Sequence, residues 1–135
     1  DIDIQTDFSS NSTVFEADLL VTDWSGIAYE YAFTTKKPVL FVDTPMKVMN
    51  PEYQKIDTVP INIWMRDVIG DRLDPTKTEE TENKVRNLLE QKDAYHDRIE
   101  KFVEEYVYNL GNSAEVGAKY IVQAVQEQIK KAKEQ

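Results

Sequence analysis

The stretch that decides the fold is Leu19-Leu20-Val21-Thr22-Asp23-Trp24-Ser25-Gly26-Ile27. Its first four residues form an apolar run without alternation, which predicts a strand covered on both faces. The next four residues predict a turn, and residues 27–34 have helical character. Lys36-Lys37-Pro38 ends that helix, because basic residues favour a helix C-terminus and proline breaks the backbone pattern. The chain is therefore expected to pass from strand to turn to helix.

A second apolar run, Val39-Leu40-Phe41-Val42, follows the predicted helix and predicts a second buried strand. A strand, a helix and a strand in this order form a unit that is almost always parallel and right-handed. We therefore expect an α/β, Rossmann-like fold with a short parallel sheet. Prolines interrupt residues 43–75, where Ile61-Asn62-Ile63-Trp64 is expected to form either a short strand or a hydrophobic lid.

Residues 76–135 carry no proline, and their apolar positions recur at helical spacing. The pattern predicts helix breaks near Lys92-Asp93 and over 110–113. The last helix is predicted to bury one stripe of side chains: Ala114, Ala118, Ile121, Ala124, Val125 and Ile129. We expect one domain over residues 1–135, with a βαβ part at 1–75 and a helical part at 76–135.

The composition limits the classes of function. The 135 residues include no cysteine, which excludes disulfides and thiolate metal sites and fits a reducing cytosol. Acidic residues outnumber basic ones by 25 to 16, and a net charge of −9 argues against nucleic acid as a partner. One histidine and scattered carboxylates offer no metal constellation, so neither a metal nor a cofactor is expected. No apolar run approaches the ~20 residues that cross a bilayer.

The turn at Ser25 and Gly26 is suited to binding a phosphate. The first turn of a helix leaves N–H groups without partners, and their partial positive charge favours anions. Ser25 offers a hydroxyl donor and can cap the helix, while Gly26 lets a phosphate oxygen approach the backbone. Thr22 and Asp23 lead into this turn and complete the predicted phosphate-binding set. A plain helix cap, without a ligand, fits the same residues.

Glu30 lies further along the same predicted helix, where its carboxylate can accept hydrogen bonds from two sugar hydroxyls. An ordinary solvated helix residue is the other interpretation of Glu30. Arg66 and Arg72 lie in the irregular region and can also reach a phosphate.

The stretch from Ala17 to Tyr31, followed by Lys37-Pro38-Val39-Leu40-Phe41, resembles the CDP-glycerol glycerophosphotransferase family, which makes teichoic acid and related polymers. The family carries a similar strand and turn, then an aromatic and acidic helix, then a basic residue and proline before the next strand. The late turn Gly111-Asn112-Ser113-Ala114 is also similar to one in the family. The resemblance covers nearly the whole chain and is most specific in the first third.

The resemblance implies a GT-B arrangement of two Rossmann-like domains, in which this chain is the C-terminal, donor-binding part of a larger transferase. Ser25 and Gly26 would then contact the donor pyrophosphate and Glu30 the ribose. Trp24 stands where the family usually has tyrosine, and Gly26 stands where it usually has a second serine. The turn also resembles that of UDP-sugar enzymes with the same fold, so a glycosyltransferase that uses a UDP- or other nucleotide-sugar is an alternative.

The implied reaction transfers polyol-phosphate from a nucleotide-diphosphate donor such as CDP-glycerol to an envelope polymer. No catalytic residue is assigned within the chain. His96 is expected to be an ordinary exposed residue, and the family's catalytic histidines are expected upstream of residue 1. The isolated fragment is therefore expected to be inactive, and the parent enzyme to be cytoplasmic. Its basic C-terminal tail can touch anionic lipid at the inner face of the membrane. A non-catalytic α/β interaction module is the remaining alternative.

Overall fold

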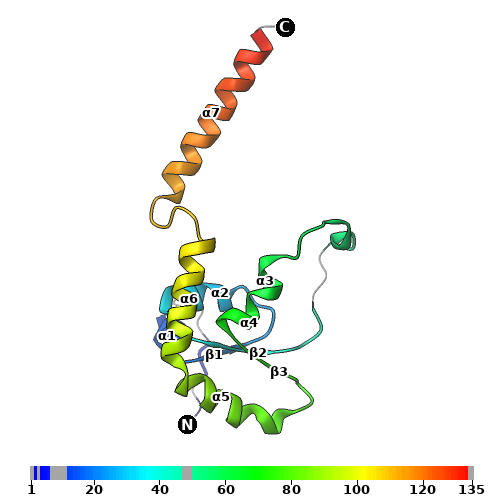
Figure 1. Ribbon diagram of the computed structural model, residues 1–135, viewed down its shortest axis with the longest axis vertical. Helices are drawn as coiled ribbons and strands as arrows, with labels where there is room; N and C mark the ends of the chain where they lie inside the picture. Colours follow the sequence, from blue (N-terminus) through cyan, green and yellow to red (C-terminus); the bar gives the residue numbers. More distant parts are fainter. Residues whose placement is uncertain (1, 3, 7–11, 47–49, 134–135) are drawn as a thin grey trace. The chain divides into compact units, whose positions relative to one another are not determined.

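Two parallel strands and the helix between them form the strand–helix–strand unit that the sequence predicts (Figure 1). The computed structural model describes residues 2, 4–6, 12–46 and 50–133. Within them, β1 spans Leu20–Thr22, α2 spans Ile27–Thr35 and β2 spans Val39–Val42. Leu20 lies opposite Val39 in the parallel register. The α/β class and the parallel pairing are both confirmed.

A third strand, β3 at Gly70–Leu73, extends the sheet in the order β1-β2-β3 and pairs in parallel with β2. The sequence pattern did not predict it, because its two central residues are charged. Asp71 accepts a hydrogen bond from Lys84 at 2.8 Å. Arg72 pairs with Asp67 through Nε and Nη2, each at 2.8 Å. Charged partners on neighbouring elements thus replace the apolar run that usually marks a buried strand.

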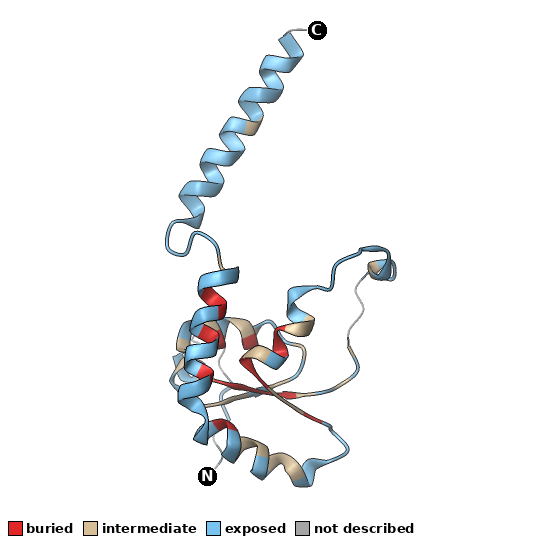
Figure 2. Cartoon of the chain, viewed as in Figure 1, coloured by how far each residue is buried: buried red, intermediate tan, exposed pale blue. Residues whose placement is uncertain are grey.

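The core of the first unit forms around β2, whose first three residues are fully buried. From α2, Ala28, Tyr31 and Ala32 are buried as well. Buried positions gather on the sheet and on the helices beside it (Figure 2). The Tyr31 hydroxyl donates to the carbonyl of Ala17 at 2.9 Å. Burial raises the pKa of Tyr31 to about 12, because the phenolate would lose its hydration.

Two helices, α5 at Thr81–Glu90 and α6 at Lys92–Tyr106, carry the apolar stripe that the sequence predicts. The break between them falls at Gln91, next to the predicted position. The Phe102 ring on α6 stacks on Phe33 of α2 at 5.8 Å between centroids, and it meets the edge of Trp64 at 5.6 Å. These aromatic contacts join α6 to α2 and to the segment before β3.

Short elements fill the remaining connections: α1 at Ser12–Glu16, η1 at Tyr53–Lys55, α3 at Ile61–Trp64, α4 at Arg66–Ile69 and η2 at Thr78–Glu80. Residues 61–64 were expected to be a strand or a lid. They form a helical turn, so the strand alternative is wrong. Ile63 N–H donates to the carbonyl of Pro60 at 3.0 Å, which closes that turn directly after the proline.

Strand β1 differs from its prediction in burial. Val21, at its centre, is 50% exposed. The expectation that this strand is covered on both faces is therefore wrong. Val21 is exposed between the half-buried Leu20 and Thr22, so one face of this outer strand is open to solvent.

The chain divides into two units, Asp1–Val103 and Glu104–Gln135. The second contains α7 at Ser113–Lys133, which has no buried residue. The predicted buried stripe is wrong, since Ile121, Val125 and Ile129 are each more than half exposed. Periodicity predicted which residues share a face, but not whether that face is covered. The single-domain organisation stays a prediction. No helix in the described ranges is long and apolar enough to span a membrane.

Candidate functional site

The predicted site residues meet where β1 ends and α2 begins. Thr22 is the last residue of β1, and the chain bends over the next two residues before α2 opens. Ser25, Gly26 and Glu30 are all exposed, whereas Thr22 is half-buried. In an open parallel sheet, ligands bind at the carboxyl ends of the strands, and this turn lies at that end of β1.

The helix start uses its own backbone for its first hydrogen bonds. Ala28 N–H donates to the carbonyl of Ser25 at 3.3 Å, and Tyr29 N–H donates to that of Gly26 at 3.1 Å. The N-cap residue is Gly26, and no side chain caps the helix. The expectation that the Ser25 hydroxyl caps α2 is therefore wrong, because the cap position lies one residue later. The hydroxyl is not occupied by a capping bond.

Gly26 has open space around it. A Cβ atom added there would meet no atom within 4 Å, and the backbone angles, φ −61° and ψ −24°, suit any residue. Among the described residues, no hydrogen bond takes up the N–H groups of Gly26 and Ile27. These two donors, together with the positive end of the α2 dipole, give the turn the physical means to bind an anion.

Glu30 lies four residues after Gly26, so both are on the same side of the first turns of α2. Its N–H group donates to the carbonyl of Gly26 at 3.5 Å, and its side chain reaches solvent. A phosphate at the helix start and a polyol or ribose beside Glu30 would therefore be neighbours. This arrangement brings three of the predicted residues, Ser25, Gly26 and Glu30, to one small surface.

The turn is tied to the loop that follows β2. Trp24 Nε1 donates to the carbonyl of Thr44 at 2.8 Å. The next residue back, Asp43, donates its N–H to the carbonyl of Leu73 at 2.8 Å, at the end of β3. Backbone and indole hydrogen bonds thus link the carboxyl ends of all three strands. The sequence pattern did not predict a role for Asp43 or Thr44. An acidic residue directly after a buried strand could have indicated a polar contact at the carboxyl end of the sheet.

Arg66 does not reach the surface as the sequence suggested. It is fully buried, and its Nη1 lies 2.9 Å from the Asp43 carboxylate. Its guanidinium carbon is 3.9 Å from the centroid of the Trp24 ring and 4.7 Å from that of Phe41. Arg72, the other arginine considered as a phosphate contact, pairs with Asp67.

A hollow of about 610 Å³ opens near the carboxyl ends of β2 and β3. Acidic and basic side chains both line it: Asp43, Arg72, Asp74, Lys77, Glu80 and Lys84. Lys84 pairs with Asp71, and Lys77 lies 3.9 Å from Glu80. Hydrogen bonds from Thr76 to Asp74 hold the pKa of that carboxyl below its usual range. The charged side chains at the hollow are thus balanced, three acidic against three basic, and two prolines, Pro45 and Pro75, also line it.

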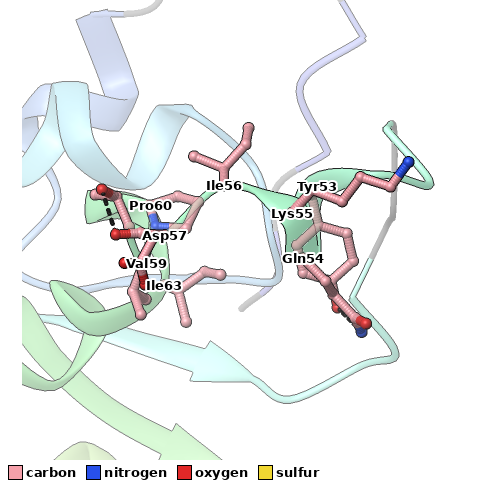
Figure 3. A pocket seen from close by; sticks show the side chains of 9 residues that line it. Tyr53, Gln54, Lys55, Ile56, Asp57, Val59, Pro60 and Ile63 are labelled. Carbon is pink, nitrogen blue, oxygen red and sulfur yellow. Dashed lines mark hydrogen bonds between the residues drawn. The ribbon is translucent and has the colours of Figure 1, made fainter.

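A second hollow, of about 420 Å³, lies in the exposed segment between β2 and α3 (Figure 3). It is lined by residues 53–60 and Ile63. None of the residues predicted to bind phosphate lines this hollow, so the hollow and the turn share no residue.

In the described ranges, no three histidine or carboxylate side chains are placed so that they could hold a metal ion together. The His96 imidazole lies 3.5 Å from Asp97 on α6 and is half exposed. Neither residue belongs to the turn.

The comparisons with known proteins agree with the resemblance at the turn. A model of the CDP-glycerol:poly(glycerophosphate) glycerophosphotransferase family matches residues 2–125. Neither a curated protein nor a solved structure matches the chain. The family match covers the turn, α2, the sheet and most of α7, which is far more than half of the sequence. The chain therefore belongs to the CDP-glycerol:poly(glycerophosphate) glycerophosphotransferase family.

Proposed function

We propose that this chain binds the donor nucleotide of a GT-B glycerophosphotransferase, which moves polyol-phosphate from a CDP-linked donor to a teichoic-acid-like envelope polymer. The observation that carries the proposal is the exposed Ser25-Gly26 turn, which opens α2 at the carboxyl end of β1 in a member of this family. The N–H groups of Gly26 and Ile27 would bind the pyrophosphate, and Glu30 would accept the ribose hydroxyls.

In the proposed reaction, an acceptor hydroxyl attacks the phosphorus that carries the polyol. The bond from that phosphorus to the nucleoside monophosphate breaks, and a base takes the proton of the hydroxyl. Donors at the turn would stabilise the negative charge that develops on the leaving phosphate. The described residues at the turn are suited to that charge stabilisation, and the base is expected outside this chain.

The test is a calorimetric titration of the full-length protein with CDP. We expect Ser25→Ala and Glu30→Ala each to weaken CDP binding about three- to tenfold, since each removes one ligand hydrogen bond or hydrogen-bond pair. Thr34→Ala on α2 and Glu100→Ala on α6 are matched controls, because both residues are exposed and lie outside the turn. Unchanged affinity in both site variants would contradict the proposal.

A nucleotide-sugar donor is the second candidate, and Gly26 is the observation that favours it. A panel of CDP-glycerol, CDP-ribitol and UDP-sugars, compared by the thermal shift each gives to the full-length protein, separates the two donors. Stabilisation by UDP-sugars alone would assign the chain to a glycosyltransferase.

A further inference from the structure

We infer that Arg66 is a positioning residue for the donor turn, Asp23–Gly26. Its buried guanidinium holds the Trp24 ring, and Trp24 in turn fixes the backbone that presents the N–H groups of Gly26 and Ile27. This inference rests on the proposed donor site and names a residue, outside that site, on which its geometry depends.

The contacts of Arg66 place it directly behind the turn. Its side chain is 0% exposed, so it contacts no solvent. The guanidinium lies over two rings, with its carbon 3.9 Å from the Trp24 centroid and 4.7 Å from the Phe41 centroid. One ring belongs to the turn and the other to the central strand, β2. The cation therefore joins the turn to the buried central strand of the sheet.

Trp24 is held at two points. Its ring covers the Arg66 guanidinium, and its Nε1 donates to the carbonyl of Thr44 at 2.8 Å. A side chain fixed by a stacking contact and a hydrogen bond has little freedom to rotate. Since Trp24 directly precedes Ser25, fixing the Trp24 side chain also limits the motion of the peptide groups in the turn.

Electrostatics argues against a purely packing role for Arg66. Burial of a cation costs free energy, and an apolar residue of similar volume would fill the same space without that cost. Only Nη1 has a carboxylate partner, while Nε and Nη2 are buried without a hydrogen-bond partner among the described residues. The Asp43 carboxylate and the two ring faces are what compensate the charge.

Lysine cannot take the place of Arg66. Its ammonium group is a compact point charge, whereas the planar guanidinium stacks on ring faces while it donates to a carboxylate. Lysine keeps the positive charge but loses the stacking geometry. The Arg66→Lys variant therefore separates the charge of this side chain from its shape.

The test measures CDP affinity and donor kinetics of the full-length protein carrying Arg66→Lys. We expect CDP binding and the donor KM to weaken by about five- to thirtyfold, the range of a desolvated cation–π contact. The acceptor KM should stay unchanged, because the acceptor does not use the turn. Arg86→Lys is the matched control, since Arg86 is an exposed arginine on α5 paired with Glu82.

A double-mutant cycle with Ser25→Ala distinguishes positioning from stability. If Arg66 positions the turn, Ser25→Ala should cost much less in the Arg66→Lys background than in the wild type. A merely structural role would lower the melting temperature and leave the CDP affinity of the folded protein, and the effect of Ser25→Ala, unchanged. That result would overturn the inference.

One further variant and a comparison with the site variants distinguish a failure of this inference from a failure of the proposed donor site. If Arg66→Lys does not fold, Trp24→Leu tests the same contact from the other side, and we expect a similar loss of CDP affinity. Unchanged affinity in Trp24→Leu would overturn the inference. If Ser25→Ala and Glu30→Ala weaken CDP binding but Arg66→Lys does not, only the role of Arg66 is wrong. If none of them matters, the proposed donor site itself is wrong.

Discussion

At Gly26 the backbone has right-handed helical angles and the surrounding space is open. Nothing in the local fold requires glycine there. The family resemblance places a second serine at this position. We therefore expect Gly26→Ser to raise the free energy of unfolding by a few tenths of a kcal/mol, because serine is a slightly better N-cap than glycine.

The same substitution should tighten CDP binding about threefold to tenfold, since it adds a hydroxyl donor beside the proposed pyrophosphate position. Calorimetric titration of the full-length protein measures this change. Gly117→Ser on α7 is the control, because a side chain there also meets open space. Weaker CDP binding in Gly26→Ser would instead show that a ligand needs the bare backbone at this position.

Because Tyr31 is buried, it makes the free energy of unfolding depend on pH in the alkaline range. Its pKa is raised from 10.0 to about 12 in the folded protein, so the unfolded chain loses its proton first as the pH rises. The folded state is therefore progressively destabilised as the pH rises from 10 to 12, by about 2 kcal/mol at pH 12. Below pH 10 the phenol keeps its proton in both states, so this destabilisation is absent.

Tyr31→Phe tests that linkage. At pH 7 we expect the variant to be about 1 kcal/mol less stable, because it lacks the hydrogen bond to the Ala17 carbonyl. Between pH 10 and 12 the gap should close and reverse, since phenylalanine does not ionise. Urea unfolding across this pH range measures it, with exposed Tyr108→Phe as the control. A constant gap from pH 7 to pH 12 would contradict the assigned pKa.

At the scale of elements, β3 depends on a close approach to β2. A Cβ atom on Gly70 would lie 1.8 Å from the carbonyl oxygen of Val39, which is backbone and has no room to move. We expect Gly70→Ala to lower the free energy of unfolding by at least about 3 kcal/mol, because the two strands must separate to admit the methyl group.

Equilibrium urea unfolding measures the effect of Gly70→Ala. The control is Gly117→Ala in α7, where a methyl group meets no atom and helix propensity favours alanine by about 1 kcal/mol. A Gly70→Ala protein within about 0.5 kcal/mol of the wild type would show that β3 does not pair with β2 in this register.

Elements with a strong local pattern were predictable from the sequence. The apolar runs at 19–22 and 39–42, and the stop at Lys36-Lys37-Pro38, predicted β1, α2 and β2 with small errors at their ends. Strand β3 was not predictable in this way, because Asp71 and Arg72 are stabilised by partners that are distant in sequence or on other elements. Tertiary pairing made a strand from residues that local preference would place in a loop.

The candidate site was predictable only in part. Ser25, Gly26 and Glu30 could be placed together because they lie within six residues of one chain segment. The contact of Arg66 with Trp24 behind these residues could not be predicted. The two residues are distant in sequence, and no local pattern indicates that an arginine is buried. Contacts between distant segments determine which charged side chains are buried in the core.

At the scale of the whole molecule, the first unit buries apolar side chains, whereas the second unit leaves them exposed to water. In the first, Ile99 is 0% exposed, and in the second Ile121 is 63% exposed. We expect Ile99→Ala to lower the free energy of unfolding by about 2 to 5 kcal/mol, through lost burial and a cavity.

Ile121→Ala should change the unfolding free energy by less than about 0.5 kcal/mol, because the side chain is already exposed to water. The two variants form a matched pair, identical in chemistry and different only in burial. Chemical unfolding of the same protein measures both. A large loss of stability in Ile121→Ala would show that α7 is covered by another surface in solution.

The indole of Trp24 also gives the turn an optical signal. The chain contains two tryptophans, and Trp24 is the one that stacks on a cation at the proposed donor site. In a Trp64→Phe background, its emission would report on the turn alone within this chain. Any ligand that shifts the indole relative to the guanidinium would change the intensity or the wavelength of that emission. The contact that restrains the turn therefore makes its movements visible by fluorescence.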